Sequence, residues 1–214
     1  MVGLWSVFDA RRSWLTPFVL LIGGFALLGN AASTWSADTP AARIMKFSLP
    51  DSTGKLHTPK EWRDQEAVVL YFIGTECPVS NGYSPDMQAI AKKYGPRGVV
   101  RYGVHVDPSV SAEVPAAHAK DYGLAFPILL DHEQKLAQMA GARVTPDAIV
   151  VTPDGTVRYR GRIDNRYALD GKRRDVPTKH ELVDALEAVL AGKQPAVAET
   201  KAFGCPLPLL RSSR

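Results

Sequence analysis

Residues 68–80 read Val-Val-Leu-Tyr-Phe-Ile-Gly-Thr-Glu-Cys-Pro-Val-Ser, and this stretch decides the fold. Its first six residues form an unbroken apolar run of strand formers, which is typical of a central strand covered on both faces. Residues 74–78 break the run, and apolar residues then recur at helical spacing from Met87 to Tyr94. The stretch therefore predicts a buried strand, a turn that carries Cys77, and a helix.

Further strands and helices alternate downstream of this helix. The predicted strands are residues 99–106, 126–130, 148–151 and 157–159, and the predicted helices are residues 111–122, 131–139 and 178–190. Ser109 or Ser111 is the expected N-cap of the first of these helices, and Pro153-Asp154-Gly155 between the last two strands is a hairpin signature. Alternation predicts parallel strands with crossover helices, and the late hairpin adds antiparallel edges. The predicted fold class is therefore α/β, with a central mixed β-sheet flanked by helices on both faces.

The N-terminus has the features of an export segment. Arg11 and Arg12 precede an apolar stretch that runs from Trp14 to Gly29, and small residues follow it. This order is that of a secretory signal, whereas an uncleaved membrane anchor would need about 20 apolar residues. Either interpretation places the rest of the chain outside the cytoplasm, periplasmic or tethered to the inner membrane and facing the periplasm. We expect a signal peptide or anchor at residues 1–37, a folded domain at residues 38–195 and a C-terminal tail at residues 196–214.

Composition and charge exclude several classes of protein. The formal net charge is +4 and the basic residues are scattered, so nothing indicates a nucleic-acid partner. The chain has only two cysteines, Cys77 and Cys205, so a zinc site of four thiolates is ruled out. We expect no metal and no organic cofactor.

Cys77 is the candidate nucleophile. A cysteine at a helix start faces unpaired backbone N–H groups and the positive end of the helix dipole, and both lower the pKa of its thiol. Pro78 suits the first helical position, and the hydroxyl of Ser80 is placed to donate to the sulfur. Glu76 acts in the opposite direction, because a nearby carboxylate raises a thiol pKa. The inert alternative is a buried structural cysteine.

Residues 69–78 resemble the thioredoxin superfamily, in particular the redoxin branch of AhpC/TSA-like and TlpA-like proteins. Further landmarks are Leu49-Pro50-Asp51, Val144-Thr145-Pro146 and Asp154-Gly155, and the resemblance extends over residues 45–192. It implies the thioredoxin fold, a cis peptide before Pro146 beside Cys77, and a substrate ledge formed by Thr145 and Pro146, with Pro78 next to it. It also implies a thiolate that attacks disulfides or peroxides.

The chain departs from this family at three positions near Cys77, one of which is Glu76, where thioredoxins often carry a tryptophan. Thioredoxins carry a second cysteine where this chain has Ser80, so the site is Cys-x-x-Ser. Peroxiredoxins carry a threonine where this chain has Gly74, and Thr75 lies one position away. If the tail folds back, Cys205 would supply the missing second thiol; otherwise it is idle or pairs with another chain.

We predict an exported thiol-disulfide oxidoreductase with an antioxidant or redox-homeostatic role. Cys77 is the nucleophile, Thr75 and Ser80 polarise the site, and Cys205 is the resolving thiol if the tail brings it to Cys77. The expected partners are a protein or small-molecule disulfide or peroxide and a thiol reductant. The alternatives are a thiol peroxidase and a non-enzymatic thioredoxin-like binding module or copper chaperone, in which His118 would join the two thiols as in SCO-like relatives.

A basic segment at residues 159–174 precedes the last predicted helix. It is expected either to line the entrance to Cys77 and attract anions or to form a salt-bridged surface loop.

Overall fold

The computed structural model describes residues 42–208, which lie in one compact unit. The predicted signal peptide or anchor at residues 1–37 lies outside the described residues. Between residues 42 and 208, no helix is both long and apolar enough to cross a membrane.

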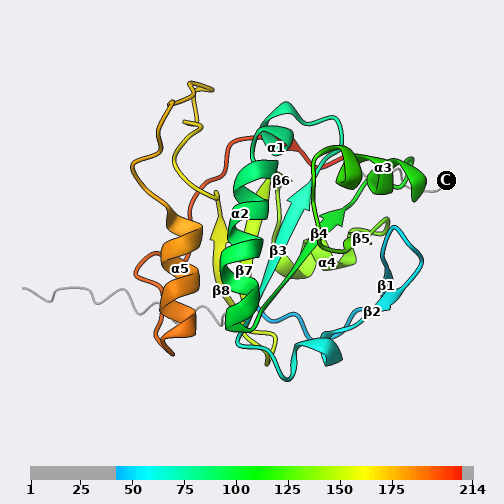
Figure 1. Cartoon of the computed structure of the whole chain (residues 1–214), viewed down its shortest axis with the longest axis horizontal. Helices are drawn as coiled ribbons and strands as arrows, with labels where there is room; N and C mark the ends of the chain where they lie inside the picture. Colours follow the sequence, from blue (N-terminus) through cyan, green and yellow to red (C-terminus); the bar gives the residue numbers. More distant parts are fainter. Residues whose placement is uncertain (1–41, 209–214) are drawn as a thin grey trace, which may run out of the picture. The chain divides into compact units, whose positions relative to one another are not determined.

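A five-stranded mixed sheet forms the centre of the domain, in the order β5-β4-β3-β7-β8 (Figure 1). β3 (Ala67–Ile73) pairs in parallel with β4 (Val99–His105), and β4 pairs in parallel with β5 (Ile128–Leu130). On its other side β3 pairs antiparallel with β7 (Asp147–Val151), which forms the predicted hairpin with β8 (Val157–Gly161). The predicted α/β class with a mixed sheet, and with it the thioredoxin fold, is confirmed.

β3 is apolar throughout because each of its faces contacts a different core. Val69, Tyr71 and Ile73 belong to one buried cluster, and Val68, Leu70 and Phe72 belong to the other. Successive side chains of a strand point to opposite faces, so a strand covered on both sides has no polar alternation.

Helices cover both faces of this sheet. α2 (Ser84–Tyr94) and α5 (Glu181–Leu190) contribute to the first cluster and lie in front of the sheet in Figure 1. α4 (Lys135–Ala140) contributes to the second cluster, on the opposite face. α3 (Glu113–Asp121) lies beside β5 at the sheet edge. The flanking helices are therefore where the sequence pattern predicts them.

Three helix starts are later than predicted: α5 begins at Glu181 rather than at residue 178, and the other two differ for a local reason. α3 is capped by Ala112 without a side-chain hydrogen bond, because the Ser109 hydroxyl donates instead to Asp107 Oδ1 at 2.6 Å. α4 begins at Lys135 rather than at residue 131, because the Asp131 side chain turns back to accept the Ala137 amide at 2.8 Å.

The remaining elements are short. They are β1 (Leu49–Pro50), β2 (Leu56–His57), η1 (Pro59–Trp62), α1 (Pro78–Gly82), η2 (Gly95–Arg97), β6 (Val144–Thr145) and β9 (Cys205–Pro206). Three of these, α1, β6 and β9, form the candidate site.

Candidate active site

Cys77 lies in the turn between β3 and α1. It is the N-cap residue of α1, and Pro78 opens that helix with an exposed ring. The Ser80 amide donates to the Cys77 sulfur at 3.4 Å. The Ser80 donor at the sulfur is therefore its backbone amide rather than the predicted hydroxyl. The Ser80 side chain is buried.

The Thr145-Pro146 corner lies directly against this turn. The Thr145-Pro146 peptide is cis, and the Cys77 thiol donates to the Thr145 carbonyl oxygen at 3.0 Å. A Cβ added at Gly74 would lie 3.0 Å from Thr145 Oγ1 and 3.3 Å from the Cys77 Cβ. A side chain at position 74 would therefore press on the corner unless the Thr145 hydroxyl shifted.

The C-terminal segment brings the second cysteine to the same place. β9 pairs antiparallel with β6, and Cys205 is opposite Thr145 in the register. The approach is so close that a Cβ at Gly204 would lie 2.0 Å from the Thr145 carbonyl oxygen. Both cysteines are free thiols in this structure; Cys77 is 4% exposed, and Cys205 is half-buried.

The pKa values of the two thiols are shifted in opposite directions. Burial alone would raise the pKa of Cys77, but hydrogen bonds from the Cys205 and Thr145 side chains and from the Ser80 and Cys205 amides bring it below its usual range. Burial, together with the neighbouring Cys77, raises the pKa of Cys205 to about 11. Cys77 is therefore the more readily ionised of the two thiols.

The source of this shift differs from the one that the sequence predicts. The sequence assigns it to the helix start, yet α1 contributes one amide, that of Ser80, and the tail and the Thr145 corner contribute the other donors. Glu76, which was expected to oppose ionisation, has an exposed side chain and does not reverse the direction of the shift.

A cavity of about 690 Å³ opens beside the two sulfurs. Its lining includes Thr75, Glu76, Cys77, His105, Val106, Asp107, Ser109, Val110, Ser111, Val114, Thr145, Cys205, Pro206 and Pro208. This volume lies in the range of small-molecule sites.

His105 is a cavity residue that the sequence argument did not select. It ends β4 in register with Ile73 of β3, it is 2% exposed, and its Nδ1 has no hydrogen-bond partner. Burial lowers its pKa to about 4, so the ring is neutral at physiological pH. The carboxyl ends of adjacent parallel strands meet at one sheet edge, and that rule applied to β3 and β4 would have placed His105 beside the Cys77 turn.

Thr75 and His118 have structural contacts of their own. The Thr75 carbonyl oxygen accepts from Asn81 Nδ2 at 2.9 Å, and Asn81 Oδ1 lies 2.7 Å from His118 Nε2. Thr75 lines the cavity, but the donors to the Cys77 sulfur are other groups. Residues 42–208 contain no group of three or more His, Cys, Asp or Glu side chains placed to hold a metal ion, so the copper-carrier alternative with His118 has no support here.

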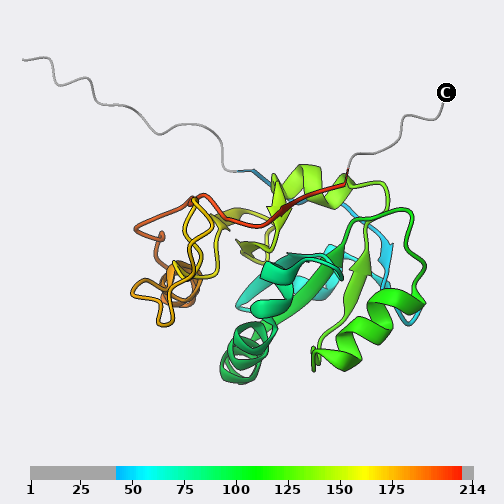
Figure 2. The same cartoon turned by 90° about the horizontal axis from the view of Figure 1, so that it is seen from above.

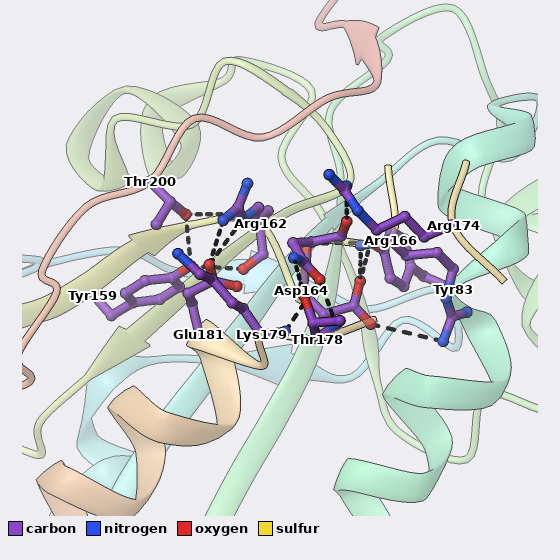
Figure 3. A network of polar contacts seen from close by, with 11 residues as sticks. Tyr83, Tyr159, Arg162, Asp164, Arg166, Arg174, Thr178, Lys179, Glu181 and Thr200 are labelled. Atoms are coloured by element: carbon purple, nitrogen blue, oxygen red, sulfur yellow. Dashed lines mark hydrogen bonds and ion pairs between the residues drawn. The ribbon is translucent and has the colours of Figure 1, made fainter. Parts of the chain in front are cut away.

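The basic segment at residues 159–174 forms a network of ion pairs (Figure 3). Arg162 pairs with Glu181 of α5, and Arg166 holds both carboxylate oxygens of Asp86 at 2.7 and 2.9 Å. No residue of this segment lines the Cys77 cavity. The salt-bridged alternative is therefore confirmed, and the expectation that the segment lines the entrance to Cys77 is wrong.

Comparison with known proteins places these features in a family. The model of the AhpC/TSA family matches residues 40–160. The thiol-disulfide oxidoreductase ResA of Halalkalibacterium halodurans is 27% identical over 152 residues, which cover 69% of this chain and 84% of the relative. ResA of Geobacillus thermodenitrificans is 26% identical over 148 residues, which cover 69% of this chain and 83% of that protein.

Solved structures show the same architecture. A hypothetical protein from Sinorhizobium meliloti 1021 matches with a TM-score of 0.70 and 29% identity, covering 79% of this chain and 93% of that one. An uncharacterized conserved protein from Geobacillus kaustophilus matches with a TM-score of 0.71 and 24% identity, covering 81% of this chain and 94% of that one. The second likeness concerns the fold alone.

Proposed function

The chain belongs to the AhpC/TSA family, and from this premise we propose that it is a thiol-disulfide oxidoreductase in which Cys77 is the nucleophile and Cys205 the resolving thiol. The relatives named thiol-disulfide oxidoreductase support a redox function. The observation that carries the residue assignment is the β6–β9 pairing, because it holds Cys205 opposite Thr145 and in hydrogen-bonding reach of the Cys77 sulfur.

In the first step the Cys77 thiolate attacks one sulfur of a substrate disulfide. The substrate S–S bond breaks, a Cys77–substrate disulfide forms, and the departing thiolate takes a proton from solvent. Cys77 suits this step because its lowered pKa increases the fraction of thiolate. Thr145 lines the cavity beside Cys77 and would contact the attacked sulfur.

In the second step Cys205 attacks the Cys77 sulfur of the mixed disulfide. The second substrate thiolate leaves and takes up the proton that Cys205 gives up, so the substrate has gained two electrons and two protons. The protein is left with a Cys77–Cys205 disulfide, which an external thiol reductant must reduce. Once Cys77 is bonded to substrate it carries no charge, so one cause of the raised Cys205 pKa is removed.

Two single substitutions test this order with bis(2-hydroxyethyl) disulfide as the substrate. Intact-mass spectrometry of Cys205→Ser should show a stable mixed disulfide at Cys77, with one 2-mercaptoethanol released. Cys77→Ser should form no such adduct in the same time, and the unmodified protein should release two thiols per chain. A mixed disulfide that accumulates equally in the unmodified protein and in Cys205→Ser would contradict the resolving role of Cys205.

We also infer that the protein is exported, either as a cleaved periplasmic domain or as one tethered to the inner membrane. The support is the order of Arg11, Arg12 and the apolar stretch in residues 14–29. Expression of the full chain followed by cell fractionation tests it, with Ile22→Arg as the variant that interrupts the apolar stretch. Recovery of the unmodified chain in the cytoplasmic fraction would contradict export, and the mass of the mature chain separates cleavage from anchoring.

A further inference from the structure

Residues 198–208 form a strap that runs from β8 to the Cys77 cavity, and Figure 2 shows it in red as it crosses the domain. Its first part is paired with the main chain of Arg160, through Arg160 N to Ala198 O at 3.0 Å and Thr200 N to Arg160 O at 2.9 Å. The Thr200 hydroxyl adds a bond from the Arg162 amide at 3.0 Å (Figure 3).

Residues 203–208 of the strap also contact the rest of the domain. Phe203 stacks on Tyr167 with ring centroids 6.4 Å apart. Beyond the cysteine, Leu207 N donates to Arg143 O at 3.3 Å, and Gln134 Nε2 donates to Pro208 O at 2.7 Å. The strap is therefore fixed on both sides of Cys205, and the two-residue strand β9 is the part that lies on the ledge.

β9 occupies the main-chain edge that a polypeptide substrate would need. An extended peptide that binds at a sheet edge does so by main-chain hydrogen bonds to that edge. At β6 this edge is already paired, with Val144 opposite Pro206 and Thr145 opposite Cys205. Gly204 leaves no gap, because even a Cβ on it would meet the Thr145 carbonyl oxygen at 2.0 Å.

We propose that the strap restricts the enzyme to small-molecule disulfides and excludes disulfides within extended polypeptide chains. This inference rests on the proposed function, since it concerns what reaches Cys77. With β9 in place, the substrate must reach the sulfur through the cavity of about 690 Å³. Val106, Val110 and Val114 give that cavity an apolar side, which suits a compact organic disulfide better than a hydrogen-bonded peptide strand.

Gly204→Ala is the variant that lifts the strap from the ledge, and its effect on access is measured as a ratio of two rates at the same thiol. The added methyl group cannot fit against Thr145, so β9 must lift from β6. Gly192→Ala is the matched control, since a Cβ there meets nothing within 4 Å. Its φ of +69° strains the backbone of an alanine at that position, but this strain is confined to the end of α5. Both are made in a Cys205→Ser chain, so that only the first chemical step is observed.

The experiment compares the rates at which Cys77 forms mixed disulfides with bis(2-hydroxyethyl) disulfide and with insulin. For each protein the insulin rate is divided by the bis(2-hydroxyethyl) disulfide rate. This ratio is then divided by the same ratio measured for free 2-mercaptoethanol, a thiol that no strap covers. The Cys205→Ser chain should discriminate against insulin. Gly204→Ala should raise the ratio of the insulin rate to the small-disulfide rate by about tenfold or more, as expected when about two main-chain hydrogen-bonding positions become available. Loss of the Cys205 amide as a donor to the Cys77 sulfur changes both rates by a common factor, which cancels in this ratio. Gly192→Ala should change neither rate.

Three results would overturn the restriction or its premise. If the ratio of the insulin rate to the small-disulfide rate is the same for the Cys205→Ser chain as for 2-mercaptoethanol, the strap excludes nothing. An unchanged ratio of the insulin rate to the small-disulfide rate in Gly204→Ala, repeated in a chain that ends at Lys201 and so lacks β9, would show the same even if the first variant is destabilised. Cys77 that reacts with neither probe would instead overturn the proposed function.

Discussion

Asp147→Asn should stabilise the protein in a way that depends on pH. Asp147 opens β7 directly after Pro146 and is 4% exposed. Its Oδ2 accepts from the Arg143 amide at 3.2 Å, while its Oδ1 has no partner. Burial raises the pKa of this carboxyl to about 6, although Arg143 and Arg160 partly offset the cost of the charge.

The magnitude follows from the two protonation equilibria. The pKa rises from 3.8 in the unfolded chain to about 6 in the folded protein. The folded state therefore holds the proton more tightly, and the associated stability is fully present below pH 3.8 and is lost as the pH rises through about 6. At 1.36 kcal/mol for each pKa unit, the loss over the whole transition is about 3 kcal/mol, and most of it falls between pH 4 and pH 7. The asparagine variant carries no charge and escapes this loss.

Urea unfolding at pH values from 4 to 8 measures the effect. The free energy of unfolding of Asp147→Asn, minus that of the unmodified protein, should rise with pH up to about pH 7. Asp154→Asn is the control, because Thr152 and Thr156 hold the pKa of that exposed carboxyl at about 2 and it should titrate below this window. A difference for Asp147→Asn that stays constant from pH 4 to pH 8 would refute the reasoning.

Two side chains that line the Cys77 cavity, His105 and Glu76, give further predictions. The pKa of His105 is lowered by burial to about 4, so the unmodified protein should lose stability as the pH falls from 6.5 to 4, by about 3 kcal/mol at most. Urea unfolding of His105→Gln should show that this loss is removed. A loss in the variant as large as in the unmodified protein would contradict the assignment to His105. Glu76 places an exposed carboxylate at the cavity, so Glu76→Gln should lower the rate of Cys77 with cystamine relative to dithiodipropionate by about twofold at low salt and not at high salt. A rate ratio that does not respond to the substitution would show that this charge is too far from the path of the substrate.

Much of the fold could be predicted because its signals are local and redundant. The apolar run of β3 must be buried on both faces, and the Pro153-Asp154-Gly155 turn separates the two short strands β7 and β8. The same turn after β3 that positions Cys77 also places it beside Thr145, since β3 and β7 are neighbours in the sheet.

The site could be predicted only in part, because its other half comes from a segment with no periodic pattern. β9 has two residues, and its position depends on a single close approach at Gly204 and on contacts spread from Ala198 to Pro208. Such pairing has no signature in composition or spacing. For the same reason the sequence assigned the acidity of Cys77 to the helix start, whereas the tail supplies two of the donors.

Peptide mass mapping of the oxidised protein tests the pairing of the two thiols most directly. The purified domain is reduced, treated with an excess of bis(2-hydroxyethyl) disulfide, quenched with iodoacetamide in acid and digested without reductant. We predict one peptide pair joined by a Cys77–Cys205 bridge in the monomeric fraction. Separate peptides in which Cys77 carries the small adduct and Cys205 is alkylated, or bridges found only between chains, would contradict the proposed redox pair.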